Sequence, residues 1–236
     1  MQQEDLVSTA IVFHKRLNPK LWSKGALKPK VRFHLLEIAK HFIDFIGIEP
    51  LGLADITISG SNAGYTFSRN SDLDLHLVVN IPHERERLMK QLFDAKKNQY
   101  NFQHSITLNG IHTEVYVQDL QQVHHSAGIY SVLDNKWLQI PERKEDTLDR
   151  DKVKVKYKHF VGMIRSALRS EDLQPVQKVM DDIKRLRQQG LEREGELSVE
   201  NVTFKVLRSK GYIDRLREHI SILKANKLSL ENNNEN

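Results

Sequence analysis

The stretch Ile58–Val79, "ISGSNAGYTFSRNSDLDLHLVV", decides how the first half of the chain folds. The pair Gly60-Ser61 is followed by ten residues and then by Asp-Leu-Asp, in an otherwise apolar run. Side chains alternate along a strand, so Asp72 and Asp74 share one face while the leucines line the other. Two carboxylates about 6–7 Å apart repel each other, and burying them unpaired is costly. The pattern indicates a strand with an apolar core face and a functional acidic face.

A divalent cation removes this repulsion, because Mg²⁺ prefers carboxylate oxygens together with substrate phosphates. Two such ions can activate the attacking oxygen and stabilise the leaving oxygen of a phosphoryl group. The Gly-Ser pair follows a predicted strand, residues 54–59, and precedes a segment that can start a helix. Backbone N–H groups at such a turn can bind phosphate oxygens, and glycine allows a close approach. The residues therefore predict a nucleoside triphosphate held between the Gly-Ser turn and metals on the aspartates.

The combination of Gly-Ser, a ten-residue spacer and Asp-x-Asp resembles the signature of the DNA polymerase β-like nucleotidyltransferase superfamily. Gly60, Ser61, Asp72 and Asp74 match that signature position for position, and the resemblance covers about residues 54–118. It implies an α+β fold with a palm-like mixed sheet and flanking helices. It also implies transfer of a nucleoside monophosphate from an NTP to a hydroxyl, with two Mg²⁺ or Mn²⁺ ions and three carboxylates.

The resemblance also assigns roles to individual residues. Asp72 and Asp74 would bind both metals, and Gly60 and Ser61 would bind the β- and γ-phosphates of an NTP such as ATP. The third carboxylate lies on a later strand in the family, and "HTEVYVQD" offers Glu114, where Asp is more usual. Glu114 would bind the catalytic metal and help deprotonate the attacking hydroxyl.

Three further polar residues have two interpretations each. Arg69, in the loop before the aspartates, is a candidate contact to the triphosphate or an ordinary solvated loop arginine. His76 completes the polar face of the aspartate strand, and we expect it to orient a carboxylate by hydrogen bonding rather than to bind metal. His112 either belongs to the same polar face or is merely exposed.

A closer likeness concerns the segments "LNPKLW", "SDLDLHLVV" and "HHSAGIYSVLDNKW", which together resemble uncharacterised nucleotidyltransferases encoded by tailed bacteriophages. That likeness carries no known substrate. The acceptor stays open between an RNA 3′ end such as that of a tRNA, a protein side chain and another nucleotide. The alternative class is a non-catalytic nucleotide-binding protein that regulates or recruits a partner.

Hydrophobic spacing predicts the remaining elements. Residues 30–47 and 83–99 form helices, the second with Leu88, Leu92 and Ala95 on its inner face. Strands are expected at 72–80, in "NGIHTEVYVQD" after its Asn-Gly turn, and once more within "GIYSVLDNKWLQIP". Helices follow from the charged segment after Pro141 to about residue 170, and at 175–189 and 201–226. We therefore expect a catalytic domain at 1–140, a helical domain at 141–230 and a disordered tail at 231–236.

Bulk composition narrows the class of protein. The chain has 236 residues, no cysteine and 39% hydrophobic residues, which is ordinary for a soluble globular protein. No apolar run reaches the roughly 18 residues of a membrane span, and the N-terminus lacks the order of a secretory signal. We expect a cytoplasmic protein without a membrane partner, located in the host cytoplasm if a phage encodes it.

Charge is spread unevenly along the chain. Residues 48–150 carry 10 Lys/Arg against 14 Asp/Glu, whereas residues 151–230 carry 18 against 11. An acidic middle beside a basic segment suits a cation site that serves a polyanion, although solvated helix faces explain the surplus equally well. Basic residues at period two, on an extended segment or a helix end, are candidate contacts to an RNA acceptor: Lys152, Lys154, Lys156 and Lys158.

Overall fold

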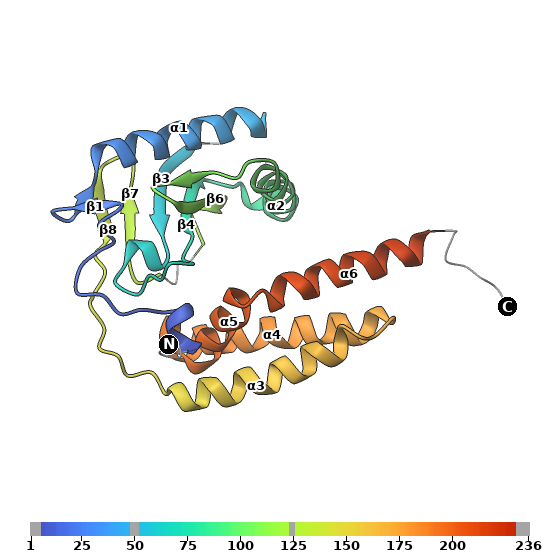
Figure 1. Ribbon diagram of the computed structural model, residues 1–236. Coiled ribbons are helices and arrows are strands. Elements are labelled where there is room, and N and C mark those ends of the chain that lie inside the picture. Colours follow the sequence, from blue (N-terminus) through green and yellow to red (C-terminus); the bar gives the residue numbers. More distant parts are fainter. Residues whose placement is uncertain (1–5, 48–51, 123–125, 230–236) are drawn as a thin grey trace. The chain divides into compact units, whose positions relative to one another are not determined.

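A computed structural model describes residues 6–47, 52–122 and 126–229 of the chain (Figure 1). The chain divides into two compact units, and the predicted tail at 231–236 lies outside the described residues. The α/β unit comprises Val12–Asp146, and the helical unit comprises residues up to Ile11 together with those from Thr147 onward. The sequence placed the boundary near residue 140 and assigned the first eleven residues to the α/β part.

The α/β unit contains a six-stranded mixed sheet in the order β5-β6-β4-β3-β7-β8. The central strands β4 and β6 are parallel, and the other neighbours are antiparallel. This confirms the α+β class, with a mixed sheet and flanking helices followed by a helical part. The strand bounds are β3 Leu53–Ser59, β4 Leu73–Val79, β5 Thr107–Leu108, β6 Ile111–Asp119, β7 Ile129–Ser131 and β8 Lys136–Gln139.

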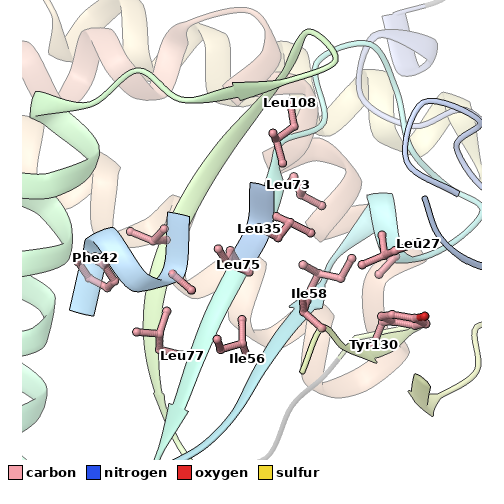
Figure 2. Packing of buried hydrophobic residues seen from close by; sticks show 14 of the residues in the cluster. Leu27, Leu35, Phe42, Ile56, Ile58, Leu73, Leu75, Leu77, Leu108 and Tyr130 are labelled. Carbon is pink, nitrogen blue, oxygen red and sulfur yellow. The ribbon is translucent and has the colours of Figure 1, made fainter. Parts of the chain in front are cut away.

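Helix α1, Pro29–Ile46, covers the apolar face of this sheet and confirms the helix predicted at 30–47. It begins with Pro29, whose missing N–H is tolerated in the first turn, and ends before Gly47, which has a left-handed φ of 67°. Leu35 and Phe42 on α1 are fully buried against the sheet (Figure 2). A short hairpin of β1, Trp22–Ser23, and β2, Ala26–Leu27, packs into the same core.

The core itself is built from alternate residues of the central strands. Leu73, Leu75 and Leu77 on β4 are at most 1% exposed, and Ile56 and Ile58 on β3 lie beside them (Figure 2). The apolar half of the alternation read from the sequence is therefore confirmed. The buried leucines also fix the direction of the polar residues between them, because neighbouring side chains on a strand face opposite sides of the sheet.

Helix α2, Glu86–Gln103, follows a 3₁₀ turn, η3 His83–Arg85, and presents a different face from the one predicted. Its buried residues are Met89, Phe93 and Tyr100. The predicted inner face is wrong: Leu88 is 67% exposed, Ala95 is exposed and Leu92 is half-buried. The prediction considered only the apolar residues of the helix itself, whereas the rotation of α2 is set by its contacts with the rest of the α/β unit.

One contact that sets this rotation is made by a polar residue. Asn101 lies near the end of α2 and forms two hydrogen bonds with the backbone of Val115 on β6. Its side-chain amide donates to the Val115 carbonyl at 3.0 Å, and its oxygen accepts from the Val115 N–H at 3.1 Å. Asn101 therefore satisfies the outer edge of β6 at this point, as a neighbouring strand would.

Two hairpins complete the sheet. Asn109 and Gly110 both have positive φ in the turn between β5 and β6, as the Asn-Gly pair predicts. The segment predicted to hold one short strand forms two, β7 and β8, joined by a turn in which Asn135 has a φ of 56°. Tyr130 pairs with Trp137 across this second hairpin, and both rings contact Trp22.

The helical unit has its own apolar core. Its helices are η1 Leu6–Thr9, α3 Arg150–Ala167, α4 Leu173–Glu194, η4 Gly195–Leu197, α5 Val199–Ser209 and α6 Tyr212–Leu228. The single helix predicted at 201–226 is two helices, because Gly211 adopts a left-handed φ of 74° and begins a new one. In the part of the chain that the structure describes, no helix is long and apolar enough to cross a membrane.

We expect Leu75→Ala to lower the free energy of unfolding of the α/β unit by about 2–5 kcal/mol, because it leaves a cavity in a closed core. Leu88→Ala, on the exposed face of α2, is the matched control and should change it by less than about 0.5 kcal/mol. Both tryptophans of the chain, Trp22 and Trp137, lie in this unit. Urea unfolding followed by tryptophan fluorescence therefore reports on it. Equal losses from the two substitutions would contradict the observed rotation of α2.

Candidate active site on the polar face of the sheet

The polar side chains of the central strands lie in rows across the sheet. Ser59 on β3 pairs with Asp74 on β4, and Asp74 pairs with Glu114 on β6. Paired residues on neighbouring strands share a face, so these three side chains form one row on the side opposite the leucines. The structure therefore brings Glu114, the candidate third carboxylate, beside Asp74.

The neighbouring rows continue the polar face. Thr57, His76 and Tyr116 form the next row toward the carboxyl ends of β4 and β6. On the other side, Asp72 directly precedes β4, and its Oδ1 lies 3.9 Å from Nδ1 of His112. Of the two interpretations of His112, the structure supports membership of the polar face, although its side chain is 40% exposed.

Gly60 packs directly against Asp74 in the row of Ser59, Asp74 and Glu114, which we call the acidic row. Its φ is 76° and its ψ is −165°, a conformation that essentially only glycine adopts. A Cβ at this position would lie 2.5 Å from Oδ2 of Asp74, which is closer than van der Waals contact allows. Both the backbone conformation and the neighbouring carboxylate therefore require the glycine of the Gly-Ser pair.

The segment after Gly60 is a single 3₁₀ turn, η2 Ser61–Ala63, rather than the start of a longer helix. The N–H of Gly60 donates to Oγ of Ser126 at 3.0 Å, so a phosphate in this turn would meet the N–H groups that follow Gly60. The first N–H groups of a helical turn have no acceptor within it. Ser61 supplies the first of these, and its own carbonyl accepts from Gly64 at 3.2 Å.

Asn62 is a positioning residue that the sequence reasoning missed. It is 1% exposed, and its side-chain amide donates to the carbonyls of Ser71 and Asp72 at 3.1 and 2.8 Å. Its oxygen accepts from Asn18 at 2.8 Å. Asn62 thus ties the turn after Gly60 to the residues where the aspartate strand begins. A polar residue directly after the Gly-Ser pair was the only signal, and its partners are distant in sequence.

Tyr116 is the second missed residue, and it contacts the acidic row directly. Its hydroxyl donates a short hydrogen bond to Oε2 of Glu114. Burial raises the pKa of Tyr116 far above 10, and the negative charges of Asp74, Glu114 and Asp72 raise it further. The phenol therefore stays protonated and remains a donor.

His76 connects Tyr116 to the Gly-Ser turn. Its ring stacks on that of Tyr116, with centroids 5.2 Å apart and an interplanar angle of 21°. His76 Nε2 and Ser59 Oγ share a hydrogen bond of 3.0 Å, and Ser59 directly precedes Gly60. We expected His76 to orient a carboxylate by hydrogen bonding. That role stays a prediction, because the hydrogen bond just described joins His76 to the hydroxyl of Ser59.

The remaining candidate residues are arranged differently. Arg69 lies exposed in the loop between η2 and β4. The four lysines of residues 152–158 lie on α3, in the helical unit, and are neither on an extended segment nor on one face, because successive helical residues turn by about 100°. Three of them pair with carboxylates: Lys152 with Asp149, Lys154 with Asp151 and Lys156 with Glu200.

The donor set suits a hard divalent cation, although its side chains are not gathered around one point. Within residues 6–47, 52–122 and 126–229, no three His, Asp or Glu side chains lie close enough together to bind a common ion as they stand. Asp72 and Asp74 offer carboxylate oxygens on one face, and the missing side chain of Gly60 lets the Asp74 carboxylate lie directly against the turn. Glu114 would complete the set after a side-chain rotation that breaks its bond to Tyr116.

Comparisons with known proteins add little to this geometry. No protein family matches the sequence, and neither does any curated protein. Among solved structures there is a similarity to the STING-associated CdnE c-di-GMP synthase from Capnocytophaga granulosa. It has 13% sequence identity, covers 95% of this chain and 88% of that chain, and has a TM-score of 0.23. At so low a score it carries no argument, and the interpretation of the site depends on its own residues.

We expect Gly60→Ala to destabilise the α/β unit more than Gly25→Ala does. Both glycines have a positive φ, of 76° and 82°, so both substitutions strain the backbone, and the ψ of −165° at Gly60 adds to the strain there. Only at Gly60 does the new Cβ meet a carboxylate, since nothing lies within 4 Å of a Cβ at Gly25. We expect Gly25→Ala to cost about 1 kcal/mol and Gly60→Ala at least twice that by urea unfolding. Equal costs would show that Asp74 does not pack against Gly60.

The raised pKa of Tyr116 predicts a loss of stability at alkaline pH. The folded protein keeps a proton that the unfolded chain releases above about pH 10, so this contribution is complete below pH 10 and is lost as pH rises further. Tyr116→Phe removes the titrating group, and its urea midpoint should fall less between pH 9 and pH 11 than that of the wild type. An identical fall would show that Tyr116 titrates normally.

Proposed function

We propose that this chain is a metal-dependent nucleotidyltransferase that moves a nucleoside monophosphate from an NTP to a hydroxyl. The observation that carries the proposal is the register of β4 and β6, which sets Glu114 directly beside Asp74. Gly60 abuts the other side of the same carboxylate. A phosphate-binding turn, an acidic pair and a third carboxylate thus meet on one sheet face. The resemblance of the Gly-Ser and Asp-x-Asp residues to the polymerase β-like superfamily agrees with this arrangement.

Two Mg²⁺ or Mn²⁺ ions fit this proposal, held by Asp72 and Asp74 together, with Glu114 as a ligand of one. When bound, such ions neutralise phosphate charge and lower the pKa of the attacking hydroxyl. The two aspartates contribute by position, because β4 fixes them on one face and its leucines anchor the strand in the core. Keeping like charges together is costly in metal-free protein, and the cations offset that cost.

The chemical step is a displacement at the α-phosphorus. The turn at Gly60 and Ser61 holds the β- and γ-phosphates, and Glu114 takes the proton of the attacking hydroxyl. A bond forms between the hydroxyl oxygen and the α-phosphorus, the bond from that phosphorus to the bridging oxygen breaks, and pyrophosphate leaves. Catalysis of this kind depends on positioning and charge stabilisation rather than on a covalent intermediate with the protein.

RNA as the acceptor stays a prediction from the sequence. Its support was the surplus of basic residues at 151–230, and three of the four lysines named there as candidate contacts are paired with neighbouring carboxylates. Ion pairs within one helical unit do not prevent contact with a phosphate backbone, but they weaken the case for these particular lysines. A cytoplasmic location is likewise part of the proposal and rests on the sequence alone.

Asp74→Asn should reduce transfer of label from an α-labelled NTP in Mg²⁺ or Mn²⁺ by at least 1,000-fold, because it removes a ligand of both ions. Thermal unfolding in metal-free buffer should show equal or higher stability, because one of the repelling charges is gone. Asp44→Asn, on the exposed side of α1, is the matched control and should transfer label as the wild type does.

If Asp74→Asn keeps an activity within about tenfold of the wild type, the Asp74 carboxylate is not part of the mechanism. The wild type should be tested with every NTP and either metal, in the presence of nucleosides, total RNA and protein acceptors. If it transfers no label under any of these conditions, the result would favour the non-catalytic class. Binding of NTP by such an inactive wild type would then identify a nucleotide-binding regulatory protein.

A further inference from the structure

A cavity of about 470 Å³ lies in the α/β unit beside the acidic row. Its size is within the range of small-molecule sites. Two strands and a helix form most of its wall, and the turn after β6 closes one side. The residues that matter for its chemistry are His76 and Tyr116, Gln118 on β6, Lys90 and Lys97 on α2, and Gln122 in the turn.

The cavity adjoins the third carboxylate. Tyr116 belongs to both, since its ring lines the cavity and its hydroxyl donates to Glu114. His76 and Tyr116 are each two residues beyond Asp74 and Glu114 on their strands, a distance of about 6.6 Å. A molecule in the cavity is therefore one row away from the proposed site of transfer.

The cavity also lies on the side from which an acceptor must approach. The turn at Gly60 and Ser61 follows β3, which pairs with one edge of β4, whereas β6 pairs with the other edge. If this turn holds the leaving phosphates, in-line displacement requires the attacking oxygen on the opposite side of the α-phosphorus. That is the side of β6 and Glu114, and the cavity adjoins it through Tyr116.

The charges of the wall favour an uncharged ligand group. Lys90 Nζ lies 2.5 Å from Oε1 of Glu86 and 3.9 Å from Oδ2 of Asp119. Lys97 Nζ lies 3.0 Å from Oδ1 of Asp94, and it also sits 5.2 Å from the ring centroid of Tyr116. Both lysines of the wall are already paired with carboxylates. A phosphate chain would have to break these pairs, whereas a neutral polar ring would not.

A buried acceptor in the wall selects for a hydrogen-bond donor. The side-chain oxygen of Gln118 is buried and accepts no hydrogen bond from the described residues. Such an oxygen is costly to leave without a donor. Rotation of the Gln118 amide toward the cavity would let a ring N–H supply that donor. Nucleobases combine a flat neutral ring with N–H donors, and the aromatic side chains of Tyr116 and His76 in the wall favour contact with the edge of such a ring.

We propose that this cavity is the acceptor subsite and that the acceptor is a nucleoside or nucleotide. Its base would lie in the cavity with an N–H donating to Gln118, and its hydroxyl would reach Glu114. The assignment rests on the proposed function and names the second substrate of that site. The attacking hydroxyl then belongs to a ribose, and transfer produces a dinucleotide linked by a new phosphodiester bond, with pyrophosphate as the other product.

Calorimetric titration with adenosine, guanosine, cytidine and uridine, in buffer containing EDTA, tests the subsite without metal or chemistry. We expect at least one nucleoside to bind the wild type saturably. Gln118→Met removes the acceptor at similar volume, and Gln122→Trp narrows the cavity from an exposed turn residue. Each should weaken that binding at least tenfold. Gln121→Met is the matched control, because Gln121 is exposed and lies outside the cavity wall, and it should bind as the wild type does.

Thermal unfolding separates loss of the subsite from loss of the fold. Gln118→Met should unfold at a temperature no lower than the wild type, because the oxygen it removes has no hydrogen bond to lose among the described residues. Absence of binding by all four nucleosides would overturn the proposal. Binding that survives either cavity substitution unchanged would place the nucleoside elsewhere and would also overturn it.

The two proposals fail in different ways. Asp74→Asn should bind the nucleoside in EDTA as the wild type does while losing transfer, so a failure of catalysis leaves the subsite measurable. With an α-labelled NTP and Mn²⁺, the wild type should convert the bound nucleoside to a labelled dinucleotide, and Gln118→Met should raise the KM for the nucleoside more than it lowers kcat. Label appearing only on RNA or on protein would overturn the acceptor subsite while supporting nucleotidyl transfer.

Discussion

The parallel pairing of β4 with β6 is the constraint on which the candidate site depends. In the observed register, Asp74 meets Glu114 while Leu75 meets Val115 on the opposite face. A slip of one residue would turn Glu114 into the core and bring Val115 to the polar face. The register is held by the core, because Leu75 and Val115 are both fully buried. Burial of apolar side chains on one face therefore determines which carboxylates meet on the other.

The carboxylates of the polar face repel one another, and neighbouring residues on that face reduce the cost of this repulsion. Tyr116 donates to Glu114, and His112 lies 3.9 Å from Asp72. Gly60 packs against Asp74 at a point where any side chain would press on the carboxylate. None of these three residues carries a permanent positive charge. A cation would reduce the repulsion between the carboxylates, and this is the physical reason for the metal dependence that we propose.

The sequence predicted the elements that depend on local pattern and missed those that depend on distant partners. Alternation in "DLDLHLVV" and the Asn-Gly turn located β4 and β6 and gave the correct facing of Glu114. The break between α5 and α6 was missed because a glycine within a helical pattern marks a new helix only when the chain must change direction. Asn62 was missed because its role comes from hydrogen bonds to residues that no periodicity selects. Alternation along β6 does place Tyr116 on the face of Glu114, but it does not indicate the hydrogen bond between them.

The rotation of α2 links the main error of the sequence reasoning to the cavity. A helix packed through Leu88, Leu92 and Ala95 would bury a side that the structure leaves exposed at Leu88 and Ala95. Packing through Met89 and Phe93 instead brings Lys90, Asp94 and Lys97 to the border of the polar face, where they pair and line the cavity. Asn101 holds this rotation by bonding the open edge of β6. The contact between Asn101 and Val115 therefore also determines which side chains of α2 line the cavity beside Glu114. A rotation of the helix about its axis moves all of its side chains together.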